Sequence, residues 1–141
     1  MKRNASAIWN GSFKDGKGMI STESGVLSDT PYSFGTRFEN GTGTNPEELI
    51  GAAHAGCFSM ALSLQLEQAG LTAESINTVA SVTLEKIESG FTITAVHLDV
   101  RAKVPGATQD AFELAANSAK AGCPVSKVLN AQITIEAKLE E

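Results

Sequence analysis

Apolar and polar residues alternate along several short stretches of the chain, a pattern typical of β-strands with one buried face. Turn residues interrupt the pattern at Asp15-Gly16 and again at Glu88-Ser-Gly90. Such turns join neighbouring antiparallel strands. The pattern therefore predicts six strands, at residues 5–13, 18–27, 31–39, 77–88, 90–104 and 132–139.

A longer segment, about residues 45–69, has apolar residues on every side of a helix. Asn45 is placed to cap its start, Pro46 to occupy its first turn, and Glu48 to close a capping box. Gly70 ends it. The segment contains several polar residues and has no basic flank, so we expect a soluble core helix and not a membrane span. A helix that is apolar all round is buried on all sides, and one small sheet cannot cover it. The pattern therefore predicts a homodimer.

Two shorter helices are expected at about residues 108–121 and 123–130, the second opened by Cys123-Pro124. The resulting element order, β-β-β-α-β-β-α-α-β, is typical of an α+β fold. The length favours one domain spanning residues 1–141, and no linker or repeat divides it.

The composition limits the kinds of binding partner and the cellular location to be expected. Apolar residues make up 42% of the chain and charged residues 19%, as in an ordinary soluble globular protein. A net charge of −5 without any basic run argues against nucleic acid or a membrane surface as partner. The first residues do not form a signal peptide, so we expect a cytoplasmic protein whose thiols are kept reduced.

The two cysteines carry the candidate chemistry. Two are too few for a disulfide scaffold or a four-cysteine zinc site. They are either a reversible redox pair or two inert core residues. Cys123 stands at a helix start, where the helix dipole favours a thiolate, whereas Cys57 lies inside a helix and needs a cation from elsewhere. Local surroundings alone predict that Cys123 is the more acidic thiol.

Other polar residues have both a functional and a structural interpretation. His54 is three residues before Cys57 on the same helix face, as in a cysteine–histidine nucleophile pair, but a lone histidine on an apolar helix is more often a hydrogen-bonded core residue. The histidines and cysteines lack the spacing of a zinc site, so no metal is expected. Glu47 and Glu48 diverge round the helix, which favours capping over acid–base catalysis. Arg37 by itself resembles a solvated strand residue. The glycine-rich segment before residue 45 lacks the ending of a phosphate-binding loop.

Three segments resemble the OsmC/Ohr family of bacterial hydroperoxide reductases. They are Phe-Gly-Thr-Arg-Phe-Glu at residues 34–39, Thr-Asn-Pro-Glu-Glu-Leu-Ile-Gly-Ala-Ala-His-Ala-Gly-Cys-Phe-Ser-Met-Ala-Leu at residues 44–62, and Lys-Ala-Gly-Cys-Pro-Val-Ser at residues 120–126. The resemblance extends over essentially the whole chain, and the three segments agree in identity and order.

The resemblance implies a role for each of four residues. Cys57 matches the peroxidatic cysteine, whose thiolate attacks the peroxide and becomes a sulfenic acid. Cys123 matches the resolving cysteine, which then forms an intramolecular disulfide with Cys57. Arg37 matches the arginine that supports the thiolate and polarises the peroxide, and Glu47 the carboxylate that positions this arginine. This reverses the local ranking of the two thiols, since a guanidinium in a sheltered pocket outweighs a helix terminus.

The resemblance also implies partners and assembly. It implies an intertwined homodimer with a long buried central helix and active sites at the subunit interface. The expected substrates are organic hydroperoxides, with hydrogen peroxide poorer, and the expected reductant is a small dithiol such as a dihydrolipoyl group. No metal, haem or flavin cofactor is expected. An apolar substrate pocket would be lined by residues such as Phe38, Phe58 or Met60.

Two other functions stay open at this point. One is a redox-responsive protein that binds a small ligand without multiple turnovers, and the other is a structural dimer with buried thiols. Gly56 precedes Cys57 inside the helix at a cost of about 1 kcal/mol relative to alanine. This glycine marks either the close approach of another backbone to the thiol or no special feature at all.

Overall fold

The computed structural model describes all 141 residues, which form an α+β fold of two compact units, residues 1–49 and 50–141. The elements are β1 (Ala5–Asn10), β2 (Lys17–Thr22), β3 (Thr30–Tyr32), α1 (Phe34–Phe38), α2 (Pro46–Gln68), β4 (Ser75–Ile87), β5 (Gly90–Lys103), α3 (Gln109–Gly122), α4 (Pro124–Val128) and β6 (Gln132–Glu140).

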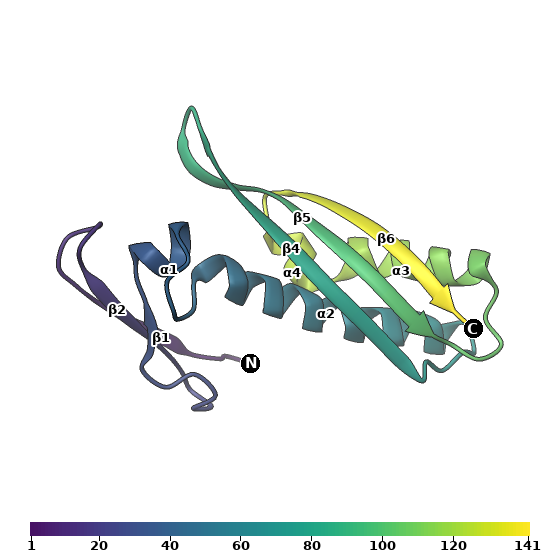
Figure 1. Cartoon of the computed structure of the whole chain (residues 1–141). Helices are drawn as coiled ribbons and strands as arrows, with labels where there is room; N and C mark the ends of the chain where they lie inside the picture. Colours follow the sequence, from purple (N-terminus) through teal and green to yellow (C-terminus); the bar gives the residue numbers. More distant parts are fainter. The chain divides into compact units, whose positions relative to one another are not determined.

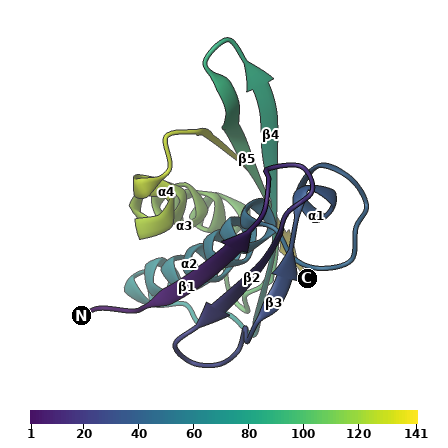
Figure 2. The same cartoon turned by 90° about the vertical axis from the view of Figure 1, so that its left-hand side faces the viewer.

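The first unit is built on an antiparallel sheet in the order β1-β2-β3 (Figure 2). The chain turns between β1 and β2 at the expected Asp15-Gly16. A side chain at Gly16 would collide with the carbonyl oxygens of Ser12 and Asn10. The turn signal therefore reflects a close approach of backbone to backbone.

The strand expected at residues 31–39 is wrong beyond Tyr32, because the chain turns there into the short helix α1. Ser33 caps this helix. Its hydroxyl accepts the N–H of Thr36 at 3.3 Å, and the Thr36 hydroxyl accepts the N–H of Ser33 at 2.8 Å. Phe34 and Phe38 share a face in a helix as well as in a strand, since positions i and i+4 coincide in both. Alternation over so short a segment therefore could not distinguish the two structures.

The second unit is a three-stranded sheet with helices on one face (Figure 1). β4 and β5 form the expected hairpin, and β6 pairs in parallel with β5. A parallel pair needs a long crossover, which α3 and α4 supply. The core contains fully buried residues of the sheet, α2 and α3: Val96, Leu98, Val100, Phe58, Leu62, Leu66 and Phe112.

The start and end of α2 confirm most of the sequence prediction. The Asn45 side-chain oxygen accepts the N–H of Glu48 at 2.7 Å, as an N-cap does. The Glu48 carboxylate, however, accepts from the Thr44 hydroxyl at 2.9 Å and not from the backbone of Asn45. The reciprocal bond of the expected capping box is therefore not formed. Gly70 ends the helix with a φ of 78°.

Within one chain α2 is covered on one side only. Phe58, Leu62 and Leu66 are fully buried, whereas Met60 is 77% exposed and Leu64 53% exposed. By length and composition alone α2 is apolar enough to cross a membrane, but its buried side belongs to the core of the second unit, as in a soluble protein. Its cover by a second subunit stays a prediction.

Candidate active site

The two thiols lie together in the second unit, although they are 66 positions apart in the sequence. The Cys57 and Cys123 sulfur atoms are 2.9 Å apart, and both thiols are free. Cys57 lies within α2, and Cys123 ends α3 and begins α4. Because a disulfide bond is about 2.05 Å long, its formation requires a shift of only about 1 Å.

The two sulfurs differ in access. Cys123 is fully buried in the core, whereas Cys57 is half-buried and lines a groove of about 710 Å³. The groove runs along α2, α3 and the start of α4, and its other lining residues include Met60, Leu64, Ser118 and Pro124. A molecule entering the groove therefore meets Cys57 first.

The three residues expected to line an apolar substrate pocket lie in different places. Met60 lines the groove beside Cys57. Phe58, the residue after Cys57, lies on the side of α2 that faces the core and is fully buried. Phe38 lines a separate pocket in the first unit.

The surroundings of the second unit favour a thiolate at Cys123. Burial raises the pKa of Cys57, and the Cys123 thiol raises it further, against a smaller opposing effect of the Val125 N–H. Burial also raises the pKa of Cys123, but hydrogen bonding with Cys57, Ser126 and Val125 outweighs burial and lowers it overall. No basic side chain of this unit acts on Cys57. The ranking from local sequence therefore holds within this unit.

His54 does not pair with either cysteine. Its side chain is fully buried, and Nε2 lies 2.7 Å from the hydroxyl of Ser126 in α4. The structure thus agrees with a hydrogen-bonded core histidine and not with a cysteine–histidine nucleophile pair. His97 lies on β5, where its Nδ1 is 2.7 Å from the Thr134 hydroxyl.

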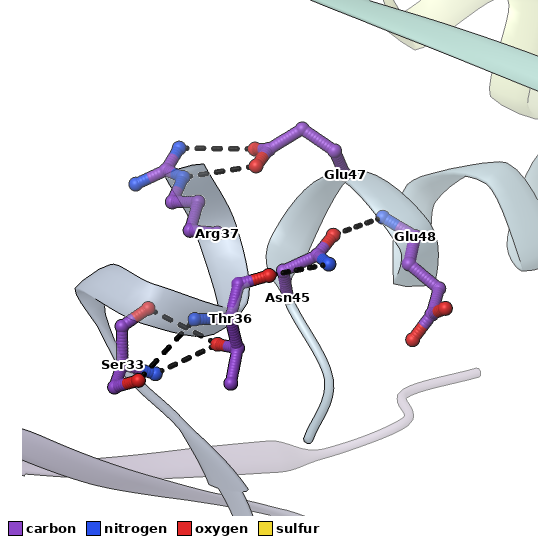
Figure 3. A network of polar contacts seen from close by, with 6 residues as sticks. All are labelled: Ser33, Thr36, Arg37, Asn45, Glu47 and Glu48. Carbon is purple, nitrogen blue, oxygen red and sulfur yellow. Dashed lines mark hydrogen bonds and ion pairs between the residues drawn. The ribbon is translucent and has the colours of Figure 1, made fainter. Parts of the chain in front are cut away.

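Arg37 and Glu47 form a bidentate ion pair in the first unit (Figure 3). Arg37 Nε donates to Glu47 Oε1 at 2.9 Å, and Nη2 donates to Oε2 at 3.0 Å. The Glu47 side chain is 10% exposed and that of Arg37 34% exposed. Asn45 also donates its side-chain N–H to the Thr36 carbonyl at 3.0 Å, which ties α1 to the start of α2. The guanidinium is therefore held in one orientation with part of it accessible.

Arg37 stands at the wall of an aromatic pocket of about 280 Å³. Its guanidinium carbon is 5.4 Å from the centre of the Phe38 ring, and the ring centres of Phe34 and Phe38 are 4.8 Å apart. The other lining residues are Trp9, Phe13, Tyr32 and Ser33. Sequence reasoning missed this pocket, because it read the segment as a strand. The spacing of Phe34 and Phe38 is the signal that could have revealed it.

The four candidate residues thus form two pairs, the thiols at residues 57 and 123 in the second unit and the ion pair at residues 37 and 47 in the first. The sulfur atoms of the first pair are 2.9 Å apart, and the second pair is joined by an ion pair of 2.9 Å. The approach of Arg37 to Cys57 stays a prediction.

The chain is similar to several known proteins. The family profile of OsmC-like proteins matches residues 39–138. The chain is 55% identical to Peroxiredoxin OsmC of Escherichia coli strain K12 over 138 residues, 98% of this chain and 96% of that protein. It is 29% identical over 124 residues to the organic hydroperoxide resistance protein OhrB of Bacillus subtilis, which covers 87% of this chain and 89% of that protein.

Solved structures show the same fold. The crystal structure of B. subtilis OhrB matches with a TM-score of 0.69 and 25% identity, over 97% of this chain and 98% of that chain. An OsmC-like protein from Mycoplasma pneumoniae matches with a TM-score of 0.77 and 12% identity, over 100% of this chain and 99% of that chain. The family profile and the full-length identity lead to one conclusion: this chain belongs to the OsmC family.

Proposed function

We propose that the protein is a cysteine-based peroxidase that reduces organic hydroperoxides and, less well, hydrogen peroxide. Its 55% identical relative is named a peroxiredoxin, and more distant relatives are named organic hydroperoxide resistance proteins. The observation that carries the proposal is the pair of free thiols 2.9 Å apart, of which only Cys57 lines the groove.

The reaction has three steps. The Cys57 thiolate attacks the distal peroxide oxygen, the O–O bond breaks, and the alkoxide takes a proton to leave as alcohol. Cys57 is now a sulfenic acid. Cys123 attacks the Cys57 sulfur, the S–O bond breaks, and hydroxide leaves with a proton as water. A dithiol then reduces the Cys57–Cys123 disulfide and is itself oxidised to a disulfide.

Access decides which thiol attacks first. The two sulfurs are close enough to share one proton, so a thiolate at one is readily transferred to the other. Cys123 is the better stabilised thiolate, but it is fully buried and a peroxide cannot reach it. Cys57 is therefore the nucleophile, and Cys123 is placed to resolve its sulfenic acid.

Arg37 is proposed to supply the cation that Cys57 lacks. Burial raises the pKa of Cys57, and a nearby guanidinium would favour its thiolate and polarise the peroxide. The bidentate bond to Glu47 fixes two of the guanidinium nitrogens and leaves Nη1 to face a substrate. The aromatic pocket beside Arg37 suits the apolar group of an organic hydroperoxide.

We expect Arg37→Ala to slow oxidation of Cys57 by cumene hydroperoxide about a hundredfold, the effect of removing one preorganised donor. Without the guanidinium the Cys57 pKa is higher, so less thiolate is present at neutral pH and the rising limb of the pH–rate profile moves to higher pH. Stopped-flow measurement of single oxidations over a range of pH values checks both effects.

Two further variants complete this test. Glu47→Gln should reproduce part of the loss, since it weakens the hold on Arg37. Arg101→Ala is the matched control, because Arg101 is 57% exposed beside Asp99 on β5. An unchanged rate in Arg37→Ala would remove Arg37 from the mechanism.

Steady-state kinetics test the proposal as a whole. With cumene hydroperoxide and dihydrolipoamide, the proposal predicts many equivalents of alcohol per subunit. A redox-responsive ligand-binding protein would stop after one equivalent, and a structural dimer with inert thiols would consume none. Parallel runs with a fatty-acid hydroperoxide and with hydrogen peroxide rank the substrates.

The expected cellular location and reductant follow from the same chemistry. We infer a cytoplasmic protein that acts in defence against oxidative stress, with a dihydrolipoyl group as reductant. A reducing cytoplasm keeps both thiols ready for the next peroxide. Its thiol and alcohol chemistry needs no metal, haem or flavin cofactor.

The exposed side of α2 supports an intertwined homodimer. Gly56, Met60 and Leu64 succeed one another at intervals of four residues and are exposed in one chain. A Cβ at Gly56 would meet no atom of its own chain within 4 Å. A second copy of α2 could therefore approach this apolar side closely.

We expect Met60→Glu to weaken the dimer, because a carboxylate in an apolar interface loses its hydration. Analytical ultracentrifugation over a range of protein concentrations should show monomers of Met60→Glu where the unmodified protein stays dimeric. Leu114→Glu is the control, since Leu114 on α3 is similarly exposed, at 72%. If Met60→Glu dimerises with the same dissociation constant as the unmodified protein, the interface lies elsewhere.

A further inference from the structure

Gly18 lies in β2, the middle strand of the first unit's sheet, between two large aromatic residues. Figure 2 shows β2 between β1 and β3, and Gly18 is paired with Trp9 on β1 and with Tyr32 on β3. A glycine weakens a strand, because it contributes no side chain to pack against its neighbours. The φ of Gly18 is not positive, so the backbone does not require a glycine at this position. The reason for this glycine therefore lies in the space beside it.

The rings of Trp9 and Tyr32 occupy that space. A Cβ at Gly18 would lie 2.7 Å from Trp9 Cε3 and 2.7 Å from Tyr32 Cζ, which is closer than real Cβ atoms approach other atoms. Neighbouring strands lie about 4.8 Å apart, so residues on the two outer strands are about 10 Å apart and are normally separated by a side chain of the middle strand. The ring centres of Trp9 and Tyr32 are only 5.4 Å apart. Gly18 therefore allows the two rings to meet across β2.

The Trp9 ring is also held by the turn between β1 and β2. Its Nε1–H donates to the Gly11 carbonyl at 3.2 Å. A Cβ at Gly16 would lie 2.9 Å from Trp9 Cε2, so the indole contacts two glycines. Both Gly16 and Gly18 are buried. The strand pairing and the turn thus fix the position of the indole against the sheet.

Trp9 and Tyr32, which we call the aromatic wall, line the pocket of about 280 Å³ beside Arg37. Phe34 and Phe38 of α1 line the same pocket. Gly18 does not line the pocket, because the two rings of the aromatic wall cover it. An atom added at Gly18 would push these rings away from β2 and toward the pocket. The missing side chain of Gly18 therefore determines how much room the pocket has.

We propose that Gly18 is a specificity-determining residue, which keeps the aromatic wall against the sheet and so leaves room for the bulky apolar group of an organic hydroperoxide. The proposal rests on the function inferred above and names the residue that sets the size of the substrate. Hydrogen peroxide has no apolar group to place in the pocket. A smaller pocket therefore disfavours a bulky hydroperoxide and leaves hydrogen peroxide unaffected.

The first test compares two peroxides in steady-state kinetics with dihydrolipoamide. Gly18→Ala should lower kcat/KM for cumene hydroperoxide about tenfold, the effect of one methyl group in an apolar pocket. The kcat/KM for hydrogen peroxide should stay the same, because that peroxide does not use the pocket. Equal losses for the two peroxides, or no loss for either, would overturn the specificity role.

Gly35→Ala is the matched control. Gly35 lies in α1 next to Phe34, but a Cβ there would meet only the Ser33 hydroxyl oxygen, at 3.6 Å, which is an ordinary contact. The same change of glycine to alanine should therefore leave both kcat/KM values as in the unmodified protein. A selective loss for cumene hydroperoxide in Gly18→Ala alone is the expected result.

The second test measures binding without any peroxide. Trp9 is the only tryptophan of the chain, so its fluorescence reports on the aromatic wall. Titration of the reduced protein with 2-phenyl-2-propanol, the alcohol formed from cumene hydroperoxide, should change the Trp9 emission until the pocket is saturated. Gly18→Ala should bind this alcohol about tenfold more weakly, and Gly35→Ala as the unmodified protein does. Since no peroxide is reduced, this result is independent of whether the protein is a peroxidase.

Two outcomes of the titration would overturn the proposal: no effect of the alcohol on Trp9 emission, or equal dissociation constants in all three proteins. Circular dichroism and thermal unfolding show whether Gly18→Ala is folded. Tyr32→Ala tests the same wall without adding an atom to β2. It removes one ring from the pocket, so the alcohol should bind more weakly. An unchanged dissociation constant in Tyr32→Ala would overturn the proposal even if Gly18→Ala does not fold.

Discussion

We expect Cys57→Ser to reduce hydroperoxide consumption to the uncatalysed rate, because the proposed nucleophile is the Cys57 thiolate. The reacting group is a thiolate, and a serine hydroxyl is not ionised at neutral pH and does not attack a peroxide oxygen. The substitution exchanges one sulfur for an oxygen at a half-buried position, so the fold is expected to persist. The measurement is consumption of cumene hydroperoxide with dihydrolipoamide as reductant, followed over many equivalents.

A neighbouring serine supplies the matched control for this variant. Ser63 lines the same groove on α2 and carries no proposed role. Ser63→Ala should retain turnover close to that of the unmodified protein, and thermal unfolding should show that both variants are folded. Undiminished turnover in Cys57→Ser would refute the proposed peroxidase mechanism, whatever the other residues do.

We expect Cys123→Ser to have the second large effect. This variant should lose repeated turnover but keep the first reaction with hydroperoxide. Cys57 should still consume one equivalent of hydroperoxide, because its access to the groove does not depend on the Cys123 sulfur. The reaction should then stop, since no second thiol lies 2.9 Å from the sulfenic acid to form the disulfide. Excess peroxide should oxidise Cys57 further, to sulfinic acid.

Mass spectrometry after dimedone treatment measures this outcome. A dimedone adduct on Cys57, at one per subunit, is expected in Cys123→Ser and absent from the unmodified protein, where the disulfide forms instead. Sustained turnover in Cys123→Ser at the rate of the unmodified protein would show that the reductant acts on the sulfenic acid itself. The intramolecular disulfide would then not be part of the cycle.

Sequence reasoning succeeded where structure is set by neighbouring residues. The Asn45 cap, the turn at Asp15-Gly16 and the hairpin between β4 and β5 all depend on contacts within a few positions. It failed at α1, where Phe34 and Phe38 fit a strand and a helix equally. There the capping bonds between Ser33 and Thr36 decided the structure, and this local signal, also three positions long, was outweighed by the alternating pattern.

The candidate site likewise has features that local sequence indicates and features that depend on long-range contacts. Local sequence ranked Cys123 as the more acidic thiol, and the structure agrees within the second unit. Local sequence did not indicate that Cys123 is buried and Cys57 accessible, which is the reason we propose Cys57 as the thiol that attacks the peroxide. The partner of His54 was equally hidden, because Ser126 is 72 positions away.

The amino-acid sequence by itself determined the α+β class, most helix and strand boundaries, and the candidate reactive residues. These depend on periodicity and on hydrogen bonds between near neighbours, which a linear pattern records. Only the tertiary structure brought the Cys57 and Cys123 sulfurs within 2.9 Å and joined His54 to Ser126. Both contacts arise because α3 and α4 carry the chain across the sheet to place β6 parallel to β5. That crossover packs α4 against α2, and no pattern within either helix specifies which distant helix it will meet.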